Sequence, residues 1–188
     1  MRIICRCHGT WTTANARYFL LPWCVPALMS GEGRPGGLKG WAFSEPLEVT
    51  FRDLDLAGHV NNAVVFTWME TVRLHHYMQV SGLDDPMQID FILAESAARY
   101  HVPVRYQHKI VAEVAPSHVG RTSWELLYRF VDRTTGTLLM QGRSVQVAYD
   151  YRTLQKKPLS EPIREKMLAA LVSAEEEGWM IPPRPMRG

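Results

Sequence analysis

Residues 46–80, PLEVTFRDLDLAGHVNNAVVFTWMETVRLHHYMQV, decide the expected fold of this 188-residue chain. Apolar and polar residues alternate over 46–52, which predicts a half-buried β-strand. Asn61 or Asn62 can cap a following helix, because an Asn side chain accepts hydrogen bonds from the first free helical amides. Apolar positions at helical spacing then predict a helix that reaches about Val80, with Gly82 as its C-terminal stop. A helix this apolar has to be enclosed by other elements.

Four further alternating runs follow the helix and predict four strands. Their apolar positions are Tyr100, Val102, Val104 and Tyr106; Ile110, Ala112 and Val114; Trp124, Leu126, Tyr128 and Phe130; and Val145, Val147 and Tyr149. Short turn-rich connections at 107–109, 118–121 and 132–137 predict antiparallel hairpins. A second, shorter helix is predicted at 162–173. This order predicts an α+β fold, in which a curved antiparallel sheet of about five strands wraps around the long central helix.

The segments outside this pattern are expected to be extensions of one domain. Residues 1–40 are predicted to be a disordered or non-native N-terminal extension, because the glycine-rich run at 31–40 has the composition of a flexible linker. An organelle transit peptide is the alternative. The domain itself is expected at 41–175, followed by an irregular, proline-containing tail at 176–188.

Composition and charge exclude several classes of function. The chain has a formal charge of +2, but its first forty residues carry +4, which leaves −2 for the domain. Nucleic acid is therefore not an expected partner. No apolar run is long enough to predict a membrane span. All three cysteines, at positions 5, 7 and 24, precede the domain, so we expect no disulfide framework in it and predict a cytoplasmic location.

The densest polar cluster, DLDLAGHVNN at 53–62, lies between the first predicted strand and the long helix. Free amides at a buried helix N-terminus can stabilise a developing oxyanion, and a carboxylate beside them can act on the same carbonyl. Asp55 could attack a thioester carbonyl directly or deprotonate an attacking water. The alternative is that Asp53 or Asp55 only caps the loop. Calcium binding is excluded by spacing, because loop position twelve is Val64.

At these positions the sequence resembles a known family. The pattern Phe51-x-Asp53-x-Asp55-x-x-Gly58-His59-Val60-Asn61-Asn62, followed by Phe66-x-x-Met69-Glu70-x-x-Arg73, is similar to the motif of the hotdog-fold acyl-CoA thioesterases of the 4-hydroxybenzoyl-CoA thioesterase-like family. The resemblance covers roughly residues 45–172. It implies a hotdog fold and hydrolysis of an acyl-CoA without a metal or organic cofactor. It also implies a homodimer or homotetramer whose sites lie at subunit interfaces.

The resemblance also implies roles for individual residues. The catalytic carboxylate falls on Asp55, and the backbone amide that polarises the carbonyl falls near Asn62. Glu70 is expected to pair with Arg73 along the helix. The implied substrate-binding positions are Gly58, His59, Val60, Asn61, Arg121 and Ser123, the last two in a turn expected to approach the phosphate or pantetheine of CoA.

Two positions depart from the family pattern. Some relatives have a histidine where this chain has Asn62, so a mechanism that needs that imidazole does not apply here. Many relatives have a tyrosine where this chain has Val65, which implies a more apolar or differently shaped acyl pocket. Two further functions stay open: an acyl-carrier-protein thioesterase and a noncatalytic module that binds acyl thioesters.

Overall fold

The computed structural model describes residues 3–7, 10–14 and 41–173. The chain divides into two units, residues 1–34 and 35–188. In the first unit, β1 (Ile3–Cys7) and β2 (Thr10–Ala14) pair as an antiparallel sheet, which the sequence analysis did not predict. The rest of the predicted extension at 1–40, and the predicted tail at 176–188, lie outside the described residues.

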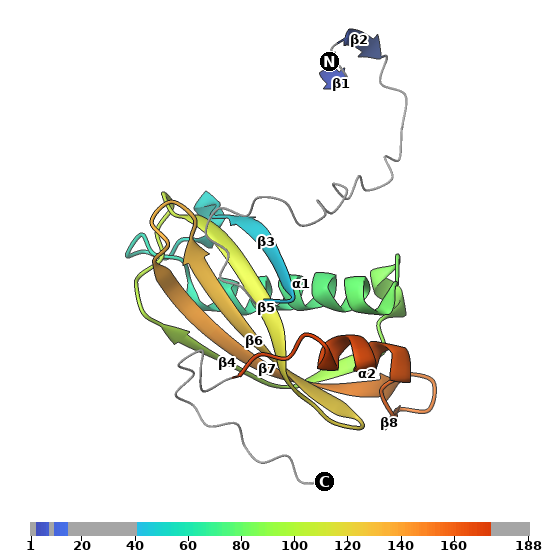
Figure 1. The fold of residues 1–188 in the computed structure, drawn as a ribbon. Helices are drawn as coiled ribbons and strands as arrows, with labels where there is room; N and C mark the ends of the chain where they lie inside the picture. Colours follow the sequence, from blue (N-terminus) through green and yellow to red (C-terminus); the bar gives the residue numbers. More distant parts are fainter. Residues whose placement is uncertain (1–2, 8–9, 15–40, 174–188) are drawn as a thin grey trace. The chain divides into compact units, whose positions relative to one another are not determined.

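The second unit contains an antiparallel sheet with the strand order β3-β5-β6-β7-β4, and β8 pairs with β7. Its strands are β3 (Phe43–Glu48), β4 (Phe91–Tyr100), β5 (Lys109–Val119), β6 (Ser123–Asp132), β7 (Leu138–Asp150) and β8 (Gln155–Lys156). The sheet curls around the long helix α1 (Asn62–Ser81), and α2 (Glu161–Leu168) follows β8 (Figure 1). The predicted α+β architecture, with five main strands around a central helix, is confirmed.

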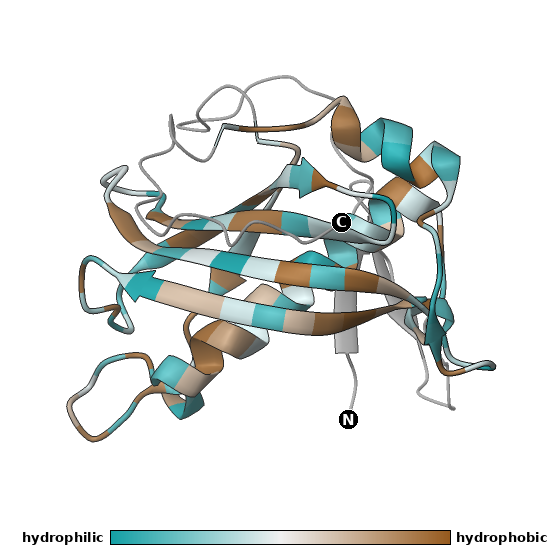
Figure 2. Ribbon diagram, turned by 90° about the horizontal axis from the view of Figure 1, so that it is seen from below, coloured by the Kyte–Doolittle hydropathy of each residue, from teal (hydrophilic) through white to brown (hydrophobic). Residues whose placement is uncertain are grey.

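The core forms between α1 and the face of the sheet that it covers. Hydrophobic and hydrophilic bands alternate along the strands, so one face of each strand can pack inward (Figure 2). The buried residues of this core include Val65, Met69 and Val72 of α1 and Trp124, Leu126, Tyr128 and Phe130 of β6. The helix thus packs against the inward-facing side chains of the strands, which are the apolar positions of the alternating pattern.

Two predicted strands are wrong in position. The strand expected at 46–52 is β3 and ends at Glu48, because Thr50 N–H donates to Asp53 Oδ2 at 2.7 Å and a 3-10 helix forms at Phe51–Asp53. The alternation at 100–106 belongs to a loop, because β4 ends at Tyr100. The N–H groups of residues 101 and 102 both donate to the carbonyl of Leu139, at 2.9 and 3.1 Å, so the start of this loop stays bonded to the sheet.

The order of the strands in space also differs from a simple series of hairpins. The hairpins β5–β6 and β6–β7 are confirmed, but β4 pairs with β7, while β5 pairs with β3 and β6. The hairpin predicted around 107–109 is therefore wrong. Helix α1 begins after the N-cap Asn61 and ends at Gly82, whose φ of 77° suits glycine, as predicted. Helix α2 is shorter than the predicted 162–173.

The predicted ion pair along α1 is wrong. Glu70 is exposed, and among the described residues no ion pair joins it to Arg73. Arg73 is instead 6% exposed and lies beside the Tyr128 hydroxyl. Burial raises the pKa of Tyr128, and the nearby guanidinium partly offsets that rise. Arg73 therefore joins the helix to the inner face of the sheet.

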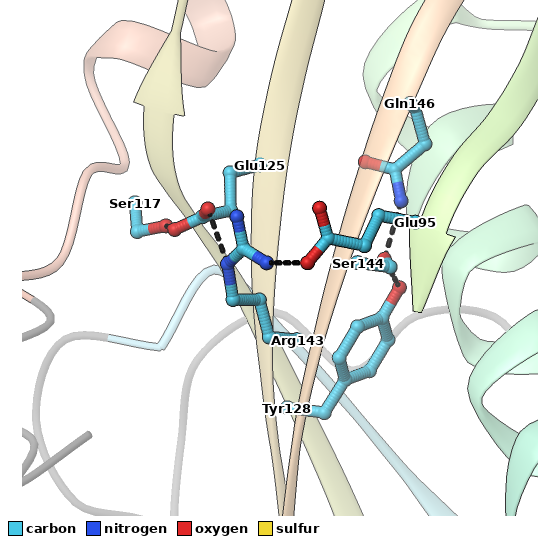
Figure 3. A network of polar contacts seen from close by, with 7 residues as sticks. All are labelled: Glu95, Ser117, Glu125, Tyr128, Arg143, Ser144 and Gln146. Carbon is cyan, nitrogen blue, oxygen red and sulfur yellow. Dashed lines mark hydrogen bonds and ion pairs between the residues drawn. The ribbon is translucent and has the colours of Figure 1, made fainter. Parts of the chain in front are cut away.

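A buried ionic cluster occupies the face of the sheet opposite α1 (Figure 3). Arg143 of β7 donates from Nε to Glu125 of β6 at 2.6 Å, and from Nη1 to Glu95 of β4 at 2.5 Å. The Ser117 hydroxyl of β5 donates to the second oxygen of Glu125 at 2.6 Å. The side chains of Arg143 and Glu125 are only 2% and 3% exposed. This cluster links four adjacent strands across the sheet.

Candidate active site

The loop between β3 and α1 is closed by its own backbone hydrogen bonds. Residues 54 and 60 form an isolated β-bridge, the Asp55 N–H donates to the carbonyl of His59 at 2.7 Å, and the Gly58 N–H donates to the carbonyl of Asp55 at 3.0 Å. Gly58 has a φ of 73°, which L-residues with a side chain rarely adopt. The glycine is therefore needed for the turn that brings residues 55 and 59 together.

The two aspartates of this loop have different surroundings. Asp53 accepts from Thr50 N–H and caps the 3-10 helix, which is a structural role. Asp55 accepts from the N–H groups of Ala57 and His59 at 2.8 and 3.2 Å, but both bonds go to Oδ1. No described residue donates to Asp55 Oδ2. Asp55 therefore holds the turn with one oxygen and keeps the other available.

The first turn of α1 leaves one backbone amide free. The Asn61 side chain accepts from the Ala63 N–H at 2.9 Å, and the Asn61 carbonyl accepts from the Val64 N–H at 3.0 Å. The Asn62 N–H makes no hydrogen bond with another described residue. A free amide at a helix N-terminus is a donor for an anion or a developing oxyanion. Asn61 is thus the cap, and Asn62 supplies the donor.

A pocket of about 360 Å³ joins the loop, the start of α1 and the loop that follows β4. The N–H of Val60 donates to the carbonyl of Val104 at 2.8 Å and holds these two loops together. The residues that line the pocket are Asp55, His59, Val60, Asn62, Tyr100, His101, Val102, Pro103, Val104 and Met140. A carboxylate and a helix N-terminus therefore meet beside a mostly apolar wall, which suits an acyl group.

Four of the predicted site residues line this pocket, and four do not. Asp55, His59, Val60 and Asn62 are in it, while Gly58 and Asn61 shape the adjoining backbone. The other two lie at the β5–β6 turn: Arg121 is exposed, and Ser123 pairs with Val147 of β7. Met140 of the pocket wall is seven residues from Val147, or about 23 Å along a strand. Within one chain, the turn and the pocket lie at opposite ends of the sheet.

Sequence reasoning missed the wall formed by residues 100–104 and Met140. The alternation at 100–106 is typical of a strand, which would place these side chains in the core and on the surface rather than around a pocket. Tyr100 is half exposed, and burial of its hydroxyl raises its pKa, which keeps the phenol neutral. The His101 Nε2 lies 2.8 Å from Gln141 Oε1, which fixes the ring at the pocket edge. No local sequence signal identified these residues.

Within residues 3–7, 10–14 and 41–173, no group of three or more His, Cys, Asp or Glu side chains is arranged to hold a metal ion. In the same described part of the chain, no helix has both the length and the apolar character needed to cross a membrane.

Sequence comparison identifies related proteins. The profile of a family described as the thioesterase-like superfamily matches residues 49–170. The uncharacterized protein YsmA of Bacillus subtilis (strain 168) is 26% identical over 88 residues, which are 47% of this chain and 60% of YsmA. The chain thus aligns with less than two thirds of that relative's length.

Structural comparison identifies the same fold in several solved proteins. A thioesterase of Thermus thermophilus, crystallised with coenzyme A and Zn, superposes with a TM-score of 0.63 at 28% identity, over 71% of this chain and 96% of that one. A mutant 4-hydroxybenzoyl-CoA thioesterase in complex with 4-hydroxybenzoyl-CoA gives a TM-score of 0.60 at 16% identity, over 66% and 97% of the two chains. The predicted hotdog fold is confirmed.

Proposed function

Because this chain belongs to the thioesterase-like superfamily, we propose that it hydrolyses an acyl-CoA thioester to the free acid and CoA. The observation that carries the proposal is the pairing of a free carboxylate oxygen on Asp55 with a free backbone amide at Asn62, both lining one pocket. The amide would receive the oxyanion, and the carboxylate would act on the carbonyl carbon or on a water. The apolar wall would hold the acyl group.

Asp55 has two chemical routes to the same products. In the first, its oxygen attacks the thioester carbonyl, CoA thiolate leaves, and water hydrolyses the resulting anhydride to restore the carboxylate. In the second, Asp55 takes a proton from water, the hydroxide attacks the carbonyl, and the tetrahedral intermediate expels CoA thiolate, which is then protonated. In both routes the Asn62 amide stabilises negative charge on the former carbonyl oxygen.

The test of the activity is a panel of acyl-CoAs with a readout of free thiol. We expect release of one thiol for each acid formed with at least one member of the panel. Release only from acyl-carrier-protein thioesters would favour the carrier-protein alternative. Saturable binding of acyl-CoA without any thiol release would favour a noncatalytic binding module.

A dimer through β4 would bring the turn that contains Arg121 to the pocket. Strand β4 is an edge strand of ten residues, and its exposed apolar side chains Ile92 and Leu93 leave it poorly protected. Antiparallel pairing of two β4 strands places the Tyr100 end of one beside the Phe91 end of the other. Ser123 lies at the Phe91 end of its own sheet. The partner's turn would then lie about 14 Å, or three strand spacings, from the pocket.

We therefore expect the protein to be at least dimeric in solution. Light scattering at micromolar concentration should give at least twice the 21.5 kDa mass of one chain. The physical reason is that pairing satisfies the free backbone groups of β4 and covers its apolar side chains. A monomeric mass under these conditions would contradict both the dimer and the shared site.

We also expect CoA to stabilise the protein, with Arg121 as one of its contacts. At a CoA concentration of 100 times Kd, mass action stabilises the native state by about 2.7 kcal/mol, which should raise the Tm by roughly 5 to 10 °C. Arg121→Ala should raise KM about 10-fold with little change in kcat, because a phosphate contact is equally strong in the ground and transition states.

The control for this contact is Arg164→Ala on α2, which removes a partly exposed arginine that does not line the pocket. Its KM should equal that of the wild type. An unchanged KM in Arg121→Ala, together with no thermal shift from CoA, would mean that another residue contacts the phosphate or that the substrate is carried by an acyl-carrier protein.

A further inference from the structure

A second pocket, of about 240 Å³, lies between α1, α2 and the residue that precedes β3. The described residues that line it are Ala42, His76, Gln79, Val80, Lys166 and Ala170. None of them lines the pocket that contains Asp55, so the two cavities are separate sites. Three of its lining residues are apolar, and three carry polar groups of different kinds.

His76 is the buried polar group of this pocket. The residue is only 2% exposed, its Nδ1 has no hydrogen-bond partner, and neither ring nitrogen bonds to a described residue. Phe43 packs against the ring edge, with centroids 6.2 Å apart, and offers no polar contact. Burial lowers the pKa of His76 to about 4, so the ring is neutral at pH 7, with one N–H donor and one acceptor nitrogen. The imidazole thus bonds to no described residue, and its ring nitrogens remain polar groups that a ligand could satisfy.

Lys166 supplies positive charge at the same pocket. Its Nζ donates to the carbonyl of Val80 in the last turn of α1 at 2.8 Å, which holds the ammonium beside the cavity. That bond uses one of three N–H groups, and no described carboxylate forms an ion pair with Lys166. The ammonium therefore has donors left for an anionic ligand, and the neutral His76 N–H can add a further one.

We propose that this pocket binds a small aliphatic carboxylate, with the carboxylate between Lys166 and His76 and the aliphatic chain against the apolar wall. The positive charge of the Lys166 ammonium selects an anion, and the imidazole N–H favours an acceptor oxygen. The wall formed by Ala42, Val80 and Ala170 favours a hydrocarbon chain. At about 30 Å³ for each water-sized group, the volume holds about eight non-hydrogen atoms. A six-carbon monocarboxylate has that size. Gln79 lies at the same pocket and can also donate to the carboxylate.

Hexanoate is the probe, and binding is followed by NMR of the His76 ring and by thermal shift. His76→Gln identifies the His76 resonance among the seven histidines of the chain. We expect a saturable change of that resonance and a rise in Tm with hexanoate, and a much weaker response to uncharged 1-hexanol. Neither readout depends on turnover, so a failure here and a failure of the proposed thioesterase activity are distinguishable.

Lys166→Met is the decisive variant, because it keeps the aliphatic stem and removes the charge. The affinity for hexanoate measured at His76 should fall at least about 10-fold, since a charge-assisted contact is lost. The matched control is Lys156→Met, an exposed lysine of β8 that does not line the pocket, and its affinity should match the wild type.

Any of four results would overturn the proposal. No saturable change at His76 would mean that the pocket holds only water. Equal responses to hexanoate and 1-hexanol would mean that it is an apolar void without anion selectivity. An unchanged affinity in Lys166→Met would place the carboxylate elsewhere, and a Tm rise without a His76 response would assign hexanoate to the other pocket.

Discussion

Asp55→Asn should lower kcat for acyl-CoA hydrolysis at least about 100-fold, the scale expected when a nucleophile or general base is removed. The fold should persist, because the Asn oxygen can still accept the hydrogen bonds that Oδ1 receives from the Ala57 and His59 amides. Steady-state kinetics and a thermal melt on the same preparation measure both effects. We expect the Tm to stay within about 2 °C of the wild type.

The neighbouring aspartate is the matched control. Asp53→Ala removes the oxygen that accepts from the Thr50 N–H, so it should destabilise the protein by about 1 kcal/mol, as for the loss of a helix cap. Most of the specific activity of the folded protein should remain. The reverse pattern, in which Asp55→Asn is unstable but active, would show that Asp55 only caps its loop and would contradict the catalytic assignment.

Oxygen-18 separates the two routes available to Asp55. After many turnovers in labelled water, direct attack followed by hydrolysis at the aspartyl carbonyl leaves oxygen-18 in the peptide that contains Asp55. A general base exchanges protons only, and the aspartate stays unlabelled. Label in this peptide, found by mass spectrometry, therefore identifies direct attack, whereas an unlabelled aspartate fits a general base or water attack at the acyl carbonyl of the anhydride.

The second large effect concerns stability. Arg143→Met should lower the free energy of unfolding by about 3–5 kcal/mol, because it leaves the carboxylate of Glu125 buried without its ionic partner. The Glu125 side chain is 3% exposed, and its Oε2 lies 2.6 Å from Arg143 Nε (Figure 3). Global stabilities are commonly about 5–15 kcal/mol, so this loss is a large fraction of the total. Urea denaturation followed by tryptophan fluorescence measures it.

Two further variants separate burial of charge from loss of packing. Glu95→Gln should cost much less, about 1 kcal/mol or below, because the Glu95 side chain is 43% exposed, so solvent screens its pair with Arg143, and Arg143 keeps Glu125 as an ionic partner. Arg143→Met combined with Glu125→Leu should recover most of the stability, since apolar side chains often replace a buried ion pair at no cost. A single Arg143→Met variant as stable as the wild type would show that the cluster contributes nothing.

The features that the sequence alone predicted are those made by local interactions. The N-cap, predicted at Asn61 or Asn62, and the C-cap Gly82 each depend on hydrogen bonds or dihedral angles within a few residues, so residue types at fixed spacing were enough to predict them. The alternation of β6 and the helical spacing in α1 reflect a single buried face and identified the core. The resemblance to the thioesterase motif implied the roles of Asp55 and Asn62, and the motif could be recognised because the loop and helix that carry it are adjacent in sequence.

Local pattern failed where long-range pairing decides the structure. The alternation at 100–106 is typical of a strand, but β4, which pairs with β7, ends at Tyr100. The loop that follows β4 forms a wall of the pocket. Periodicity cannot report this, because strand order depends on which segments far apart in sequence pair with each other. The position of the β5–β6 turn relative to the pocket follows from the same pairing.

The sequence by itself thus determined the α+β class, the central helix and the two groups, Asp55 and the amide of Asn62, that meet at its start. Only the tertiary structure decided which residues surround them, and which polar groups are buried. Arg143 and Glu125 stand at alternating positions that a local pattern assigns to solvent, and His76 lies on α1 with no signal of its own. The physical reason is that burial and charge pairing depend on neighbours brought from distant segments, whereas caps, turns and periodicity are set by residues close in sequence.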